Sequence, residues 1–469
     1  MSIQDQLHKL TPKQRKDLLL LLNKTKKAIE PEKKETTPFW EDIKDVQFQQ
    51  VLHNSKNKKN TINNIFLTGI TGYLGAHLAY QLLIDTPYTI YCLIRCQTQE
   101  LAIEKIKKTL QSYHLWSNKF NKRLIPILGD LTKPLLGIQN PLKLAKKIDI
   151  IYHCAALVNF TLPYKTLKST NVTGTKSLLE FSQLSHSIPI HYTSTYSVFL
   201  SQNLKDNTIF ESKELNNTPP NLLLGYSQSK WVSEKIINNA QNKNYPITIY
   251  RLGNITGDSN HGIYNTKDLL TNILTYCLET KTYPNIEFMV DMSPINFVTK
   301  ALVELSLKQV NEEKIIHIVN PHPTPWTTLI EEINQIGLNL TKLTELEWLD
   351  SVKKQNNINP HHPLSYFSPL LNHPNFKLNS ILFPKGTKLS IQSLDKNIQS
   401  FCPKVNLSLL AVYQQAFSYK QTLNKAFKTP HTHTLNTIKR LNKTNQPFLL
   451  PSFLTTMVVL QWVLRPTTP

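Results

Sequence analysis

Short apolar runs alternate with helical patterns from Thr61 to about residue 253, and this alternation constrains the fold more than any other feature of the chain. In order, the runs are INNIFLTG, YTIYCLIR, RLIPILGD, IDIIYHCA, IPIHYTST and YPITIYRLG. Strands separated by helices are joined by right-handed crossovers, which place the strands parallel in one sheet with helices on both faces. The pattern therefore predicts an α/β fold with a doubly wound parallel sheet.

The chain divides into four segments, of which the last, 421–469, is a basic and apolar tail. Residues 1–61 are polar and Lys-rich, and we expect a helix at 12–27 followed by a linker. Residues 62–252 form the sheet domain. Residues 253–420 are mixed, with helices near 267–279, from 297, and at 326–336 and 344–354, and with strands at 286–290 and 314–320. We assign them to a smaller substrate-side subdomain, with elements from 286–320 returning to the sheet.

Charge is strongly positive and uneven. The chain has 53 Lys and Arg against 32 Asp and Glu, a net charge of +21, which favours polyanions, phosphorylated cofactors, acidic proteins or anionic lipid. No element that reads nucleic acid is present in the sequence, so we expect no such partner. The apolar run 448–464 is shorter than the roughly 20 residues of a spanning helix. We expect this basic tail, 421–469, to pack on the body or to contact a membrane peripherally.

The five cysteines are scattered and form no paired motif, which argues for reduced thiols and against a disulfide framework or a zinc site. His431 and His433 lack further ligands, so we expect no metal. The N-terminal residues show no secretory signal. Together these features predict a cytoplasmic protein.

A glycine turn follows the first strand. The chain has only 12 glycines, yet Gly69, Gly72 and Gly75 fall within FLTGITGYLGAHL, where the first strand ends and the first helix begins. Gly69 permits a tight turn, Gly72 a close approach of the backbone to a pyrophosphate, and Gly75 close packing of helix on strand. This spacing predicts a dinucleotide site.

Residues at the ends of the next strands refine that site. Arg95 ends the second strand, where an acidic residue would favour NADH, so we expect the 2′-phosphate of NADPH there, with Lys105 as a second cation. Asp130 and Leu131 follow the third strand, beside the expected adenine. Ala155, Ala156 and Leu157 follow the fourth and give the cofactor room to pass.

Three residues near the fifth strand predict carbonyl reduction. Thr195 ends that strand, and Tyr226 and Lys230 lie four residues apart on one helix face. Hydride transfer to a carbonyl carbon leaves charge on oxygen, which requires a proton donor and hydrogen bonds. We expect Tyr226 to donate the proton, Lys230 to lower the pKa of Tyr226 and hold the nicotinamide ribose, and Thr195 to bond the substrate oxygen.

These strings resemble an extended short-chain dehydrogenase/reductase with a Rossmann-type sheet. More narrowly, they resemble the thioester reductase domains that terminate nonribosomal peptide synthetases, carboxylic acid reductases and aminoadipate reductase. The matching strings, in family order, are FLTGITGYLGAHL, CLIR, GDLTKP, IYHCAALVNF, STNVTGT, YTSTYSV, LGYSQSKWVSEK, YRLGNITGDSNHG and VDMSPINFV.

The resemblance implies NADPH-dependent reduction of an acyl thioester to an aldehyde, which some members reduce further to the alcohol. It assigns catalysis to Thr195, Tyr226 and Lys230. It assigns cofactor binding to the glycine turn, to the later strand ends and to a helix-bending Asn that also supports structure: Gly69, Thr71, Gly72, Tyr73, Leu74, Gly75, Arg95, Lys105, Asp130, Leu131, Ala155, Ala156, Leu157 and Asn171.

The resemblance also implies a phosphopantetheine thioester as substrate. Since residues 1–61 are too few for an adenylation or carrier domain, we expect an acyl or peptidyl carrier protein, or acyl-CoA, to supply the thioester in trans. Carrier proteins of this type are usually acidic, which suits a chain of charge +21.

Three alternatives stay open. A long-chain fatty acyl-CoA reductase would share the same site and would suit the apolar tail. A nucleotide-sugar epimerase or dehydratase would share the scaffold but would prefer an acidic residue at position 95. A non-catalytic module that binds NADPH would have no need for Thr195, Tyr226 and Lys230 together.

Overall fold

The computed structural model describes residues 42–43 and 62–413, with gaps at 186, 201–207, 213–214, 216–221, 309–313, 360, 375, 379–380 and 384. The expected helix at 12–27, its linker and the tail 421–469 lie outside these residues. All the helices and strands named below belong to the compact unit that begins at Phe48.

A seven-stranded sheet organises this unit, and all of its strands are parallel. Across the sheet the strands are β12 (Lys314–Ile318), β7 (Ile247–Leu252), β5 (Ile190–Thr195), β4 (Ile150–His153), β1 (Asn64–Thr68), β2 (Thr89–Ile94) and β3 (Leu124–Leu128). The strand order reverses direction beside β1, as in dinucleotide-binding folds. The doubly wound parallel sheet is therefore confirmed.

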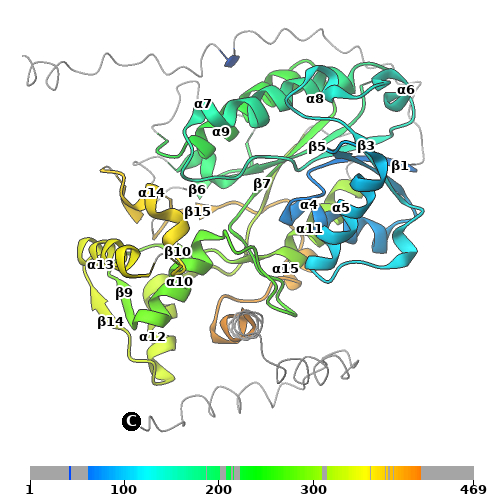
Figure 1. The fold of residues 1–469 in the computed structure, drawn as a ribbon. Helices are drawn as coiled ribbons and strands as arrows, with labels where there is room; N and C mark the ends of the chain where they lie inside the picture. Colours follow the sequence, from blue (N-terminus) through cyan, green and yellow to red (C-terminus); the bar gives the residue numbers. More distant parts are fainter. Residues whose placement is uncertain are drawn as a thin grey trace, which may run out of the picture. The chain divides into compact units, whose positions relative to one another are not determined.

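Helices cover both faces of the sheet (Figure 1). One face carries α4 (Tyr73–Asp85), α5 (Gln99–Ser112) and α11 (Ile295–Lys308), whose apolar side chains join those of the strands in one buried cluster. The other carries α7 (Tyr164–Lys168), α8 (Gly174–Ser182) and α9 (Gly225–Gln241). Burial on both faces explains why the strands are apolar along their whole length rather than alternating.

The segment that follows β7 returns to the sheet before it leaves again. Helix α11 packs against α4, and β12 adds an edge strand beside β7. The expected strand at 286–290 is shorter than predicted, because only β10 (Met289–Val290) pairs, antiparallel to β13 (Thr324–Pro325).

A second buried cluster forms the C-terminal part. It joins α10 (Leu269–Thr280), α12 (Trp326–Gln335), α13 (Glu345–Ile358) and α14 (Ser368–Leu371) around the buried Trp326 and Trp348. Helix α13 begins with a capping box in which Thr344 and Glu347 satisfy each other's backbone N–H groups.

Three further short strand pairs complete the described part of the fold, and one of them, β6 (Thr208–Ile209) with β15 (Lys388–Leu389), joins the sheet domain to the C-terminal part. The other pairs are β8 (Ile255–Thr256) with β11 (Ser293–Pro294) and β9 (Thr282–Pro284) with β14 (Thr341–Leu343). Helix α15 (Lys396–Ser400) follows, and residues 407–413 are helical as well. Within the described ranges, the helices are all too short or too polar to cross a bilayer.

The packing of α11 on the sheet makes its buried leucines sensitive to truncation. Leu302 is fully buried in the first cluster, so Leu302→Ala is expected to lower the free energy of unfolding by about 2–5 kcal/mol through lost burial and a residual cavity. Leu346 on α13 is 69% exposed, and Leu346→Ala is expected to change it by less than about 0.5 kcal/mol. Urea unfolding measures both, and equal losses would contradict the assignment of this core.

Candidate active site

The glycine turn between β1 and α4 depends on backbone packed against backbone. Gly69 has a φ of +90°, and its carbonyl accepts a hydrogen bond of 2.9 Å from the Gly72 N–H. A Cβ on Gly75 would lie 2.0 Å from the Gly69 oxygen, and one on Gly69 would lie 2.8 Å from the Ala155 nitrogen. Any side chain at either position would therefore force the turn, the helix and the end of β4 apart.

The N-terminus of α4 is open to a ligand. Gly72 is the N-cap residue, it is exposed, and it provides no side chain to satisfy the first N–H groups of the helix. Thr71 beside it is exposed as well. Free N–H groups and the positive end of the helix dipole suit an anion at this point. The residues present therefore fit a pyrophosphate.

Two cations and one carboxylate meet at the ends of β2 and β3. The Arg95 side chain is 80% exposed, and its Nη1 lies 4.0 Å from Oδ2 of Asp130. The Lys105 Nζ donates to the Arg95 carbonyl at 3.3 Å. Burial alone would raise the pKa of Asp130, but hydrogen bonds from Thr132 and the charge of Arg95 lower it. The structure thus brings together three residues that the sequence selected.

Asn171 lies in a single π turn, Ser169–Thr173, between α7 and α8. Its Oδ1 accepts from the Leu157 N–H at 2.7 Å, and its Nδ2 donates to the Leu157 carbonyl at 3.3 Å and to Oγ of Ser229 at 2.9 Å. The extra residue in the helix aims this amide at the loop after β4. Asn171 therefore ties the loop at 155–157 to α9, and these hydrogen bonds are those of a supporting residue.

Some residues predicted to bind the cofactor have side chains that contact other parts of the protein instead. The Tyr73 hydroxyl donates to the carbonyls of Thr256 and Ile263, at 3.1 and 2.8 Å, which ties the turn to the C-terminal part. Leu74 packs against the first buried cluster, and Leu131 lies beside Gly174. At Tyr73 and Leu74 it is the backbone that is left to face a nucleotide.

Thr195 and Tyr226 lie where β5 ends and α9 begins, and these two elements pack on each other. The Thr195 hydroxyl accepts from the Ser197 N–H at 3.1 Å, capping the short helix Tyr196–Phe199. The Tyr226 ring stands edge-on to Phe160, with ring centroids 5.7 Å apart. Both residues are half-buried.

Lys230 is buried one turn along α9, and its ammonium group reaches back to β5. It donates to the Tyr192 hydroxyl at 2.6 Å and to the Thr193 carbonyl at 2.7 Å. Burial lowers the pKa of Lys230 to about 7, against the opposing effects of Glu234 and Cys154. The group therefore titrates near neutral pH.

The expected effect of Lys230 on Tyr226 is not what the structure shows. Burial raises the pKa of Tyr226, and the Lys230 ammonium is directed to β5. The physical reason is that Tyr192 and Thr193 offer Lys230 two acceptors inside the protein. Sequence reasoning missed Tyr192, and no spacing rule would have selected it.

Sequence reasoning also missed an ion pair behind this site. Glu234 on α9 and Arg251 on β7 are fully buried, with Arg251 Nη2 2.6 Å from Glu234 Oε1. One signal was available, because Glu234 repeats the four-residue spacing from Tyr226 to Lys230 and so shares their helix face.

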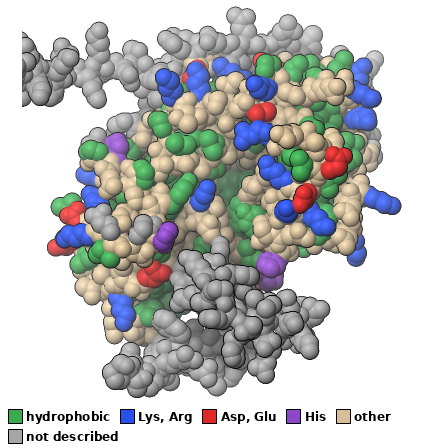
Figure 2. All heavy atoms as spheres, in the orientation of Figure 1, with side chains coloured by type: hydrophobic (Ala, Val, Ile, Leu, Met, Phe, Trp, Pro, Cys, Tyr) green, Lys and Arg blue, Asp and Glu red, His purple; other side chains and the backbone are tan. Residues whose placement is uncertain are grey.

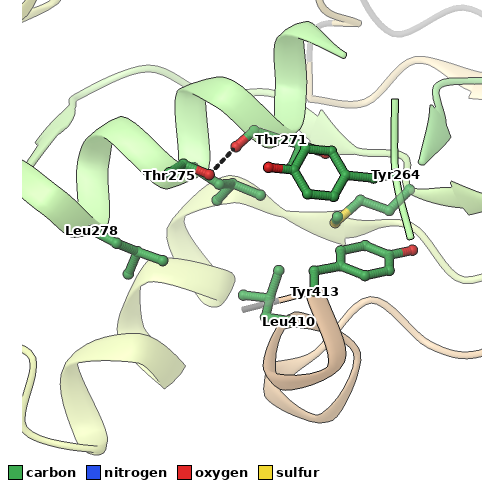
Figure 3. Close-up of a pocket in the computed structure, with 8 residues that line it drawn as sticks. Tyr264, Thr271, Thr275, Leu278, Leu410 and Tyr413 are labelled. Carbon is green, nitrogen blue, oxygen red and sulfur yellow. Dashed lines mark hydrogen bonds between the residues drawn. The ribbon is translucent and has the colours of Figure 1, made fainter. Parts of the chain in front are cut away.

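A small pocket lies in the C-terminal part (Figure 3). Tyr264 and Tyr413 approach it from different segments, α10 supplies Thr271, Thr275 and Leu278, and Leu410 closes another side. The Tyr413 hydroxyl bonds the Gly257 carbonyl and the Thr256 hydroxyl, both at 2.9 Å. Since the Tyr73 hydroxyl donates to the Thr256 carbonyl, Thr256 is hydrogen-bonded both to the pocket wall and to the start of α4.

No cluster of three or more His, Cys, Asp or Glu capable of holding a metal occurs among residues 42–43 and 62–413 outside the gaps. The candidate site is therefore built from a glycine turn, two cations at the sheet edge, and the hydroxyl and amine groups around the end of β5.

Known proteins match the chain over the same region. An NAD-binding family model described as male sterility protein matches residues 67–302. The chain is 37% identical over 290 residues to a linear gramicidin synthase of Brevibacillus parabrevis. It is 32% identical over 287 residues to L-2-aminoadipate reductase of Saccharomyces cerevisiae. These matches cover 61% and 58% of this chain but only 6% and 20% of those longer proteins.

Among solved structures, the terminal R domain from the myxalamid PKS-NRPS biosynthetic pathway superposes with a TM-score of 0.72 at 30% identity. The superposition covers 82% of this chain and 98% of that domain. A match over nearly the whole of a solved R domain, together with the family model, shows that this chain belongs to the thioester reductase (R) domain family.

Proposed function

We propose that this chain reduces an acyl thioester to an aldehyde with NADPH, the acyl group being carried on a phosphopantetheine arm of a carrier protein or on coenzyme A. One observation carries the proposal: α9, which holds Tyr226 and Lys230, packs on β5, which ends at Thr195, and the Lys230 amine donates to this strand. These are the hydroxyl, phenol and amine groups that carbonyl reduction requires.

The cofactor assignment is supported by the residues that would hold it. The open N-terminus of α4 suits the pyrophosphate, and Arg95 with Lys105 suits the 2′-phosphate that distinguishes NADPH from NADH. Asp130 and Leu131 would lie beside the adenine, and the loop at 155–157 would border the nicotinamide half. When bound, NADPH supplies a hydride to the thioester carbonyl carbon.

Residues of the chain then stabilise and protonate the negatively charged carbonyl oxygen. The Thr195 hydroxyl donates a hydrogen bond to that oxygen, and the Tyr226 phenol transfers its proton to it, which gives a hemithioacetal. The carbon–sulfur bond then breaks, the sulfur leaves as a thiol with the hydroxyl proton, and the aldehyde remains. Lys230, fixed by Tyr192 and Thr193 at the end of β5, would hold the nicotinamide ribose.

A thioester substrate is supported by the relatives, since one is named L-2-aminoadipate reductase and the solved R domain comes from a PKS-NRPS pathway. An apolar acyl part is supported by the pocket alone. The pocket in Figure 3 includes Leu274, Leu278, Met292 and Leu410, which suit an acyl chain better than a charged sugar nucleotide.

The positive charge of the chain supports an acidic carrier protein as partner. Figure 2 shows Lys and Arg side chains scattered over the viewed face, with fewer Asp and Glu among them. Complementary charge of this kind steers association and raises its rate more than it raises affinity.

Tyr226→Phe is expected to lower kcat for a thioester by about 10²-fold or more, since the proton donor is lost, while the Kd for NADPH stays within about two-fold. Absorbance at 340 nm and release of free thiol measure turnover, and NADPH fluorescence measures binding. Tyr80→Phe is the control, because Tyr80 lies on α4 against Phe120, away from the site. A wild-type rate in Tyr226→Phe would remove the catalytic assignment.

Arg95→Ala is expected to lower kcat/KM for NADPH by about ten-fold or more, through loss of a charge-assisted contact to the 2′-phosphate, and to leave NADH within about two-fold. Lys105→Ala is expected to act in the same direction, but less. Lys108 lies on the same helix, 72% exposed and paired with Glu104. Lys108→Ala should leave kcat/KM unchanged for both NADPH and NADH. Equal losses with NADPH and NADH would contradict the 2′-phosphate assignment.

A further inference from the structure

A buried ion pair stands directly behind the proposed catalytic residues. Arg251 of β7 donates from Nε and Nη2 to Oε1 of Glu234, at 2.8 and 2.6 Å, and neither side chain is exposed at all. Apolar residues of similar size commonly give at least as much stability as a buried pair of this kind. Folding alone therefore does not account for two charges at this position.

The second oxygen of Glu234 reaches the end of the catalytic strand. Oε2 accepts a hydrogen bond from Oγ of Ser194, which is buried and immediately precedes Thr195. Since adjacent residues of a strand point to opposite faces, a carboxylate that fixes Ser194 also fixes the direction of Thr195. Glu234 thereby holds the strand end from which Thr195 projects.

Glu234 also acts on Lys230, one turn earlier on α9. The groups that contact the Lys230 amine or act on its charge are Tyr192 and Thr193 of β5, His153 and Cys154 at the end of β4, and Glu234 of α9. Burial and the charge of Lys230 lower the pKa of His153 to about 3, so this ring is neutral. Burial raises the pKa of the Cys154 thiol to about 12, which leaves Glu234 as the carboxylate opposing the loss of charge from Lys230.

The outer end of the pair is anchored as well. Arg251 Nη1 lies 3.4 Å from Nε2 of His317 on β12, and Nδ1 of His317 lies 2.8 Å from the Ser390 carbonyl. Burial and Arg251 lower the pKa of His317 to about 3, so the ring is neutral, accepting from Arg251 and donating to Ser390. The ion pair is therefore held at both ends, by Ser194 on β5 and by His317 on β12.

We propose that Glu234, held in place by Arg251, is a positioning residue for the reduction. It holds the end of β5 through Ser194 and lies one turn beyond Lys230 on the same face of α9. This inference rests on the proposed function, since it concerns the same three catalytic residues.

Its test is Glu234→Gln, which keeps the size of the side chain and removes the charge. In the wild type, kcat is expected to fall as pH rises through about 7, because Lys230 loses its proton there. In Glu234→Gln this fall in kcat should occur about one pH unit lower, because the charge favouring the Lys230 cation is gone. At pH 6, kcat should be about ten-fold lower, with KM and the Kd for NADPH within about two-fold.

Two further variants separate positioning from folding. Tyr250 precedes Arg251 on β7 and points to the opposite face of the sheet, where its hydroxyl bonds His191. Tyr250→Phe therefore removes a buried hydrogen bond, as Glu234→Gln does, without changing a residue of the site. Tyr250→Phe should keep the pH dependence of kcat that the wild type shows. Glu234→Gln with Arg251→Met removes both charges and should fold even if the single variant does not. Its kcat should stay low, and the pH at which kcat falls should stay below that of the wild type. Wild-type values in either folded Glu234 variant would overturn the proposal.

A measurement without thioester keeps this inference distinct from the proposed function. If the wild type turns over no thioester, the proposed function fails. The pH dependence of the NADPH Kd then reports on Lys230, the residue assigned to the nicotinamide ribose. A shift of about one pH unit in Glu234→Gln supports the inference in that case too, and an unchanged profile overturns it.

Discussion

The contact between Gly75 and the Gly69 carbonyl is the constraint on which the rest of the site depends. It brings the first turn of α4 against the end of β1 more closely than any side chain allows. With the helix there, its open N-terminus points to the edge of the sheet where β2, β3, β4 and β5 also end. In a parallel sheet those ends share one edge, so one backbone contact orients the anion-binding turn toward the hydroxyl and amine groups of the other strands.

On the other face of the sheet, α9 brings positive charge to that edge without exposing it to water. Tyr226, Lys230 and Glu234 follow one another at single-turn spacing, and the π turn at Asn171 joins this helix to the loop after β4. The Lys230 amine is solvated by protein groups, namely a phenol and a carbonyl. Such fixed dipoles do not need to reorganise when charge develops on a substrate, which is the physical basis of electrostatic catalysis.

The sheet and the glycine turn could be predicted because their signals are local. Alternation of strands and helices predicted six of the seven strands, and spacing alone selected Gly69, Gly72 and Gly75. The direction of the Lys230 amine could not be predicted, since it depends on which acceptors β5 presents. The pair between Glu234 and Arg251 could not either, because it joins a helix to a strand across the topology. The second core, built from short irregular elements, lacks a period from which its packing could be predicted.

The network behind the site draws its members from residues 194 to 390. Ser194, Glu234 and Arg251 leave the ribosome long before Ser390, whose carbonyl orients the His317 ring that Arg251 contacts. Contacts so distant in sequence close late, after the local helices and turns have formed. The nucleotide turn, by contrast, is complete within a few residues of β1. During synthesis the chain should therefore acquire the geometry for binding a dinucleotide well before it acquires the geometry for using one.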